Sequence, residues 1–195
     1  MPVKITYHLT NQKLTDATKI ANEILASSEL PLLITEGLII NGRTIVKPRK
    51  SPFKESDPKD LKPSVVADAF KTSNLRLTLC EYDEPDTDVG GMFDPDEKSH
   101  IYANRNAIPL RSAKNLARML VHECVHALSR EDAKNDFSHC RKSHSHKETA
   151  PYWIQNALRK AHSSDTGLES EEGVIEVTLF DGDAIAATEQ NRRCK

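Results

Sequence analysis

The sequence predicts an α+β fold, in which helices back a small mixed sheet. Two observations lead to this prediction. In "LRLTLCEY", residues 75–82, apolar and polar side chains alternate, which is typical of a half-buried β-strand. Between Pro109 and Arg130 apolar residues recur every three or four positions, which is typical of a helix with one buried face. A chain of 195 residues is long enough to bury a core without disulfides.

Residues 1–47 are expected to form an N-terminal extension that contains a strand, a helix and a hairpin. "VKITYHL" predicts a short strand, and Ile20, Ile24 and Leu25 form one stripe of a helix over about residues 15–27. The dipeptide Asn41-Gly42 stands between two apolar stretches and favours the tight turn of a hairpin. Residues 48–63 hold four prolines and many charges, so we expect a surface linker there.

Residues 64–162 are expected to form the main domain. Ser64 is the predicted N-cap of a short helix in "SVVADAFKTS", and the strand over residues 75–82 follows it. "GGMFDPDEKSHIYANRN" predicts two short strands around the turn Asp94-Pro95-Asp96.

Two helices complete this domain. The longest runs from Pro109 to about Arg130, and Cys124 lies on its buried stripe as a small apolar residue. The second contains "PYWIQNALRKAH", with Pro151 in its first turn and Thr149 or Ala150 as its cap. Beyond it, residues 163–195 form an acidic tail in which "GVIEVTLFDGDAIAAT" can make a further hairpin.

Charge and composition exclude several classes of protein. With 27 basic and 29 acidic side chains the net charge is -2, so general electrostatic binding of nucleic acid is not expected. No apolar run is long enough to span a membrane, and the first ten residues lack a signal peptide's apolar core. We therefore expect a cytoplasmic protein, or one exported without such a signal. The four scattered cysteines form no CxxC pair and are expected to be free thiols.

The segment "HECVHA" contains the candidate metal-binding and catalytic residues. His122 and His126 are four residues apart, so on a helix their imidazoles project from one face and can bind one zinc ion. Glu123 lies further round the helix, where it can take a proton from a metal-bound water. The competing interpretation is an ordinary helix that carries two histidines and a glutamate without a metal.

"HECVHA" on a helix that follows an edge-strand pattern resembles the minimal zincin metallopeptidases. The resemblance covers about residues 64–162 and implies a twisted sheet that backs the active-site helix, with a second helix toward the C-terminus. It also implies an edge strand antiparallel to the substrate, for which "SHIYAN", residues 99–104, is the candidate.

The third zinc ligand is left open between three residues. The metzincin continuation is absent, because Ser129 and Asp132 stand where glycine and histidine are needed. The gluzincin pattern would use Glu148, although Pro151 argues against a helix interior there. "KSHSHKETAPYWIQNALRKA" is similar to the SprT (Spartan-like) peptidases, and that resemblance implies His146; His144 is the last alternative.

Tyr152 and Trp153 follow these candidates at the start of the second helix. We expect Trp153 to fill the core beneath the site. We expect Tyr152 to be packed or exposed, rather than to donate a hydrogen bond to the reacting oxygen. Acidic residues crowd the segment from Glu81 to Glu97, where a solvated loop beside the edge strand can favour basic substrates.

These observations predict a zinc-dependent metallopeptidase that hydrolyses polypeptide substrates, with Glu123 as general base and no membrane partner. A hydrolase of a non-peptide bond and a metal-stabilised binding module are the alternatives. A compact zincin with unrelated flanks is similar both to housekeeping SprT relatives and to bacterial toxins or injected effectors.

Overall fold

A computed structural model describes residues 3–53, 61–94, 96–97, 99–131 and 149–166. The described chain is a mixed α+β protein. Its main sheet has the strand order β1-β4-β6-β5, and a separate two-stranded hairpin is made of β2 and β3. The main-sheet strands are β1 (Lys4–Tyr7), β4 (Arg76–Tyr82), β6 (His100–Asn104) and β5 (Gly91–Phe93). The first three strands are parallel, and β5 runs antiparallel to β6 at one edge.

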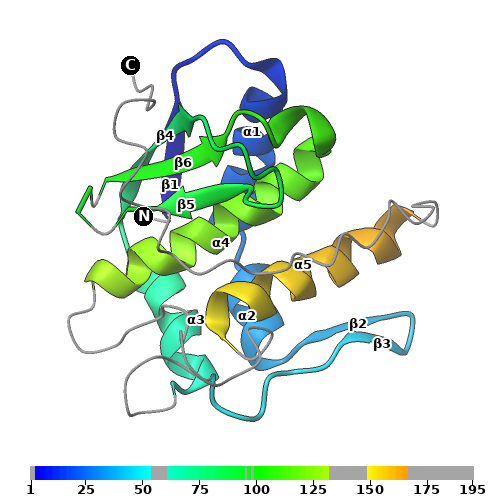
Figure 1. Cartoon of the computed structure of the whole chain (residues 1–195). Coiled ribbons are helices and arrows are strands. Elements are labelled where there is room, and N and C mark those ends of the chain that lie inside the picture. Colours follow the sequence, from blue (N-terminus) through cyan, green and yellow to red (C-terminus); the bar gives the residue numbers. More distant parts are fainter. Residues whose placement is uncertain (1–2, 54–60, 95, 98, 132–148, 167–195) are drawn as a thin grey trace.

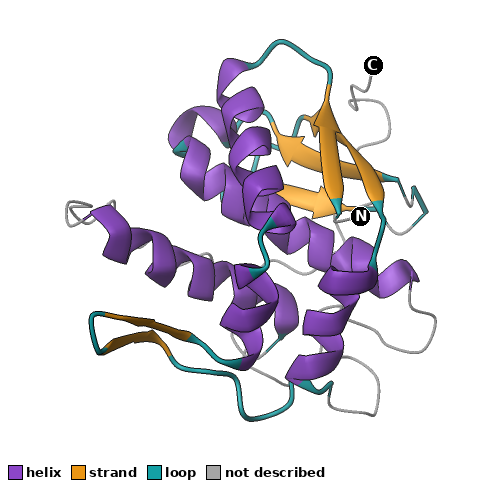
Figure 2. Cartoon of the chain, turned by 180° about the vertical axis from the view of Figure 1, so that it is seen from behind, coloured by secondary structure: helices purple, strands orange, loops and turns teal. Residues whose placement is uncertain are grey.

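Two of the five described α-helices make most of the contacts with this sheet. The five helices are α1 (Gln12–Ala26), α2 (Glu29–Thr35), α3 (Pro63–Thr72), α4 (Ala113–Glu131) and α5 (Ala150–Thr166). Figures 1 and 2 show α1 and α4 beside the sheet, and α5 with the hairpin extending away from it. Helix α4 packs on α1, α5 and β5, so it lies at the centre of the structure. None of the described helices is both long and apolar enough to cross a membrane.

The N-terminal residues contribute to the same core as the rest of the chain. β1 pairs with β4, and α1 begins at Gln12 because the Asn11 side chain accepts the N–H groups of Lys13 and Leu14. The predicted strand and helix are therefore confirmed, with the helix starting about three residues earlier than expected. Most buried apolar residues between Val3 and Leu158 form one cluster, and Cys80, Tyr82 and Tyr102 form a second, smaller one. Whether residues 48–63 divide independently folding units stays a prediction.

The predicted hairpin is confirmed. β2 (Leu38–Ile40) and β3 (Arg43–Val46) pair antiparallel, and both turn residues have positive φ, 48° at Asn41 and 75° at Gly42. These angles are those of a type I′ turn. Gly37, before the hairpin, has φ +77°, and a Cβ there would lie 2.3 Å from the Val46 carbonyl oxygen. Only glycine fits that position.

Three boundary and burial predictions need correction. Ser64 is not an N-cap, because α3 starts at Pro63 and Lys62 precedes it. The longest described helix starts at Ala113 rather than Pro109, which lies in a separate 3₁₀ turn, Ile108–Leu110. The first half of β4 alternates as predicted, but its second half is buried on both faces, since Cys80 and Tyr82 are as buried as Leu77 and Leu79. The short helix α2 was not predicted.

The edge strand was also assigned wrongly. The candidate, residues 99–104, corresponds to β6, which is internal because it pairs with β4 on one side and β5 on the other. The edge strand beside α4 is β5, the first of the two strands predicted around the turn at Asp94. The existence and antiparallel pairing of those two strands are confirmed.

The cysteines differ from one another. Cys124 is a free and fully buried thiol on α4, as expected, and burial raises its pKa. Cys80 is disulfide-bonded, so the expectation of free thiols is wrong for this residue.

Candidate active site

Helix α4 brings His122 and His126 together. The helix presents both side chains on one face, and their Nε2 atoms are 3.3 Å apart. Their ring centroids are 5.1 Å apart, at an interplanar angle of 64°. His122 is 5% exposed and His126 is half-buried, so the pair lies at the boundary between core and solvent.

The separation of these nitrogens fits a shared zinc ion. Two nitrogens that each bind a tetrahedral zinc at about 2.0–2.1 Å are about 3.3–3.4 Å apart. Imidazole nitrogen is also a preferred zinc donor, so both the spacing and the chemistry of the pair are suitable. In the part of the chain that the structure describes, no group of three or more His, Cys, Asp or Glu side chains is placed to hold a metal.

The third-ligand candidates cannot be placed beside this pair. His144, His146 and Glu148 lie outside the described residues. Thr149, directly after this segment, is buried, and its carbonyl oxygen accepts the Trp153 N–H. Helix α5 begins at Ala150. Pro151 is therefore in the first turn of the helix, as predicted. Because α5 packs on α4, the chain returns to the neighbourhood of the histidines directly after the candidate segment.

Glu123 is the buried acid of the site. It is 5% exposed, and desolvation raises the pKa of its carboxyl to about 8 from an ordinary value of 4.5. A carboxylate in such a place is a stronger base than one in water, and its protonation changes near neutral pH. The structure thus places a proton acceptor with a shifted pKa directly next to the first histidine.

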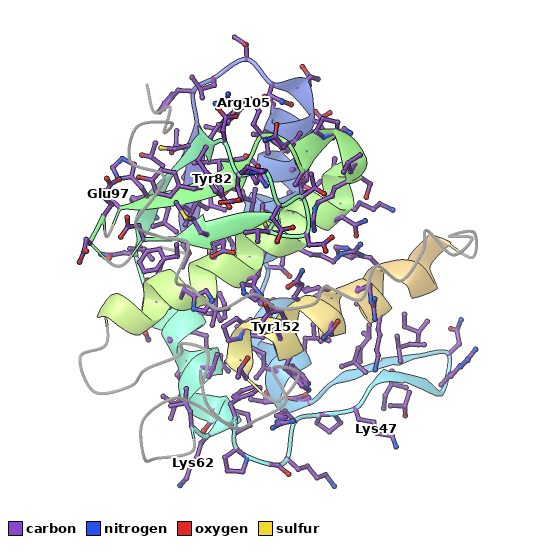
Figure 3. All side chains as sticks on the ribbon, viewed as in Figure 1. Lys47, Lys62, Tyr82, Glu97, Arg105 and Tyr152 are labelled. Carbon is purple, nitrogen blue, oxygen red and sulfur yellow. The ribbon has the colours of Figure 1, made fainter. Side chains whose placement is uncertain are left out.

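Two tyrosines approach this acid from different elements. Tyr152, on α5, packs edge-on against His122 with ring centroids 4.6 Å apart. Tyr82 is the last residue of β4 and is 2% exposed. Burial and then the nearby charge of Glu123 raise the pKa of both phenols. Figure 3 shows Tyr82 on the sheet side of α4 and Tyr152 on the α5 side.

Tyr82 was not predicted as a site residue. Its hydroxyl oxygen is buried and has no hydrogen-bond partner among the described residues. The strand pattern predicted the strand that contains Tyr82. No sequence feature near Tyr82 indicates that it lies close to the motif at residues 122–126. Trp153 is half-buried and packs edge-on against Phe53 at 5.8 Å, so its predicted role in the core is confirmed.

The edge strand β5 lies directly against α4. A Cβ on Gly91 would be 2.2 Å from the Met119 sulfur and 2.8 Å from the Tyr102 carbonyl oxygen. Strand and helix are therefore in contact one turn before His122. The loop that leads into β5 contains Glu84, Asp86 and Asp88, and Arg111 donates to the carbonyl oxygens of Thr87 and Asp88 in this loop.

Comparisons with known proteins add no family to this description. No family model, no curated protein and no solved structure matches the chain.

Proposed function

We propose that this protein is a zinc-dependent metallopeptidase of the minimal zincin type. The observation that carries the proposal is the convergence of the two Nε2 atoms, 3.3 Å apart, beside a buried glutamate. The arrangement of the sheet supports it, because a short antiparallel edge strand lies against the helix that bears the motif. We propose His146 as the third zinc ligand, with Glu148 and then His144 as alternatives.

The chemistry follows from the residues of the site. Zinc bound by the two histidines would act as a Lewis acid that lowers the pKa of a bound water toward about 7. The Glu123 carboxylate accepts the proton of the attacking water and then gives it to the nitrogen of the leaving amine. In the metal-free protein burial raises the pKa of the Glu123 carboxyl, and a carboxylate whose pKa is raised is a stronger base.

We also propose that Tyr152 assists the reaction. Its ring packs against His122, and a phenol that donates a hydrogen bond to the developing oxyanion lowers the barrier to acyl transfer. An extended polypeptide would lie along β5, where the acidic residues of the preceding loop favour a basic segment of the substrate.

The first test is hydrolysis of a denatured polypeptide, with and without a chelator, by the parent and by Glu123→Gln. We expect the chelator to stop cleavage and the variant to lose about a factor of 100 to 10,000 in rate, because it lacks the general base. Glu23→Gln, which makes the same chemical change at an exposed position of α1, should cleave like the parent.

Other results would assign a different function. Cleavage of small amides or esters but of no polypeptide would indicate a hydrolase of non-peptide bonds. No turnover of any substrate, with a melting transition that chelation abolishes, would indicate a metal-stabilised binding module. Equal rates for Glu123→Gln and the parent would refute the catalytic assignment.

A further inference from the structure

The β2–β3 hairpin is largely uncovered, since Val46 is the one buried residue of its two strands. It extends from the body beside α5 in both views, and its β3 strand contacts α5 (Figures 1 and 2). Ile39 at its centre is 65% exposed. A two-stranded hairpin is only marginally stable by itself, and a further strand would stabilise it.

The hairpin offers backbone groups for such a strand. Ile40 and Arg43 flank the two-residue turn and form its hydrogen-bonded pair, so in the next pair Ile39 directs its N–H and C=O groups outward from one edge of the hairpin and Thr44 from the other. These groups make no hydrogen bond to any other residue that the structure describes. Free groups of this kind are what an added strand binds.

The hairpin and the segment that directly follows it are basic, although the exposed Glu36 precedes them. Residues 37–53 contain four cationic side chains and no acidic one. Arg43, at the turn, and Lys47 and Lys50, beyond the other end, are exposed, and none of the three forms an ion pair with a described residue. Figure 3 shows Lys47 next to the hairpin and Glu97 at the far side of the sheet. A segment that binds the hairpin as a further strand should therefore be extended and acidic.

The chain itself contains a segment of this chemistry. Residues 163–191 include eight acidic side chains and no lysine or arginine. Within them, "VIEVTLF", residues 174–180, has the alternation of a strand, and acidic residues flank it on both sides. This segment lies outside the described residues, but α5, which leads to it, ends at Thr166 and runs alongside the hairpin.

We propose that residues 174–180 bind the β2–β3 hairpin as a third strand, with their acidic flanks against Arg43, Lys47 and Lys50. The seven residues 167–173 span up to about 25 Å when extended, and α5, which precedes them, contacts β3 of the hairpin. Ladder hydrogen bonds hold the strand, and the charges select the segment and its position. This inference does not depend on the proposed catalytic function.

Hydrogen–deuterium exchange of the full-length protein, followed by mass spectrometry, tests the proposal. In the parent at low salt, we expect the amides of residues 174–180 to exchange at least about tenfold more slowly than those of an unstructured chain. The double variant Lys47→Glu/Lys50→Glu should lose most of this protection. The matched control Lys4→Glu/Lys19→Glu, which changes the net charge equally on β1 and α1, should keep it.

A second variant, in which the charges are exchanged, distinguishes lost binding from a folding defect in Lys47→Glu/Lys50→Glu. Adding Glu171→Lys/Glu172→Lys to Lys47→Glu/Lys50→Glu should restore the protection, because the opposite charges again face each other. Exchange of residues 174–180 at the rate of an unstructured chain in the parent would overturn the proposal. So would protection that survives Lys47→Glu/Lys50→Glu, or protection that grows with protein concentration, which would indicate a second copy as the occupant.

Discussion

Glu123 shows at the scale of a single residue how the fold changes the chemistry of a side chain. Its place in the motif predicts a general base, and the structure adds that it is buried on α4, which raises the pKa of its carboxyl. The spacing of the motif predicted which atoms converge, because residues four apart on a helix share a face. It could not predict Tyr82, whose proximity to Glu123 arises only from packing of the sheet on the helix.

The pKa of Glu123 predicts a pH dependence of stability in the metal-free protein. Its carboxyl has a pKa of about 8 when folded and 4.5 ordinarily, so between these values the folded state binds more protons than the unfolded state. The free energy of unfolding therefore falls as the pH rises from about 5 through 8, by on the order of 4 kcal/mol. Urea unfolding at several pH values, compared with Glu123→Gln, measures this difference.

The Gln variant isolates the carboxyl, because both proteins keep the same histidines. The stability of the parent relative to the variant should decrease steadily over this pH range. Parallel stability curves for the two proteins would show that Glu123 is not buried as described.

At the scale of elements, local patterns predicted which elements exist better than how they are paired. Helix α4 and strand β4 follow from periodicity, and the hairpin follows from Asn41-Gly42. The order of strands does not follow, since pairing β6 between β4 and β5 depends on contacts far apart in sequence. For that reason β6 was mistaken for the edge strand. Helix α2 was missed because seven residues give too short a window for a periodic pattern.

The contact between β5 and α4 gives a prediction for two adjacent glycines. Gly91→Ala should destabilise the protein by about 1–3 kcal/mol, because the new Cβ would meet both the Met119 side chain and the Tyr102 backbone. Gly90→Ala should cost clearly less, since its Cβ meets only the Arg111 side chain, at 3.0 Å, which can move. Chemical unfolding of both variants is the measurement, and equal losses would contradict the described packing.

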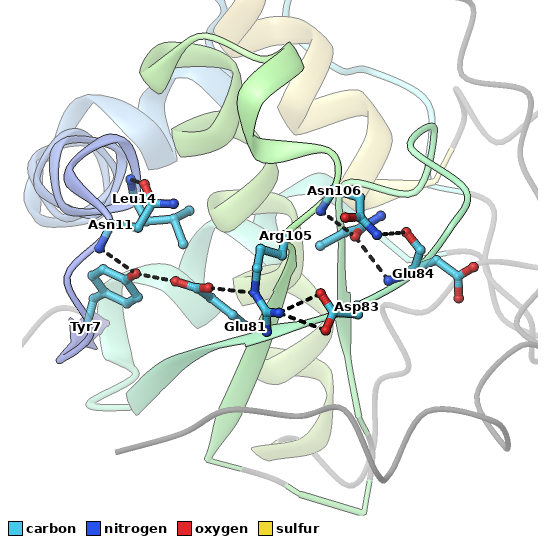
Figure 4. Close-up of polar contacts among 9 residues, drawn as sticks. Tyr7, Asn11, Leu14, Glu81, Asp83, Glu84, Arg105 and Asn106 are labelled. Carbon is cyan, nitrogen blue, oxygen red and sulfur yellow. Dashed lines mark hydrogen bonds and ion pairs between the residues drawn. The ribbon is translucent and has the colours of Figure 1, made fainter.

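At the scale of the whole molecule, the N-terminal residues are joined to the sheet by polar contacts as well as by β1. Tyr7 donates a hydrogen bond to Glu81, and Arg105 binds Glu81 and Asp83 at 3.2 and 2.7 Å (Figure 4). This cluster connects β1, β4 and the residue after β6. The sequence predicted a solvated acidic segment here. It did not indicate that Arg105, directly after β6, would lie beside Glu81 and Asp83.

Removing the cation should therefore weaken the fold. Arg105→Met leaves Glu81, whose side chain is 10% exposed, without its ion pair, and we expect a loss of about 3 kcal/mol in the free energy of unfolding. Asp83→Asn is the matched control. The Asp83 side chain is 34% exposed, so its loss should cost about 1 kcal/mol or less. A larger effect for Asp83→Asn than for Arg105→Met would contradict this account of the cluster.

The metal content of the purified protein tests the central claim most directly. Elemental analysis after purification without chelator, or after soaking with zinc and desalting, should find about one zinc ion per chain in the parent. The double variant His122→Ala/His126→Ala should retain none, while His8→Ala/His100→Ala, which alters two histidines away from α4, should bind zinc like the parent. If the parent holds no transition metal in either preparation, or if the first variant binds as much as the parent, this histidine pair is not a metal site.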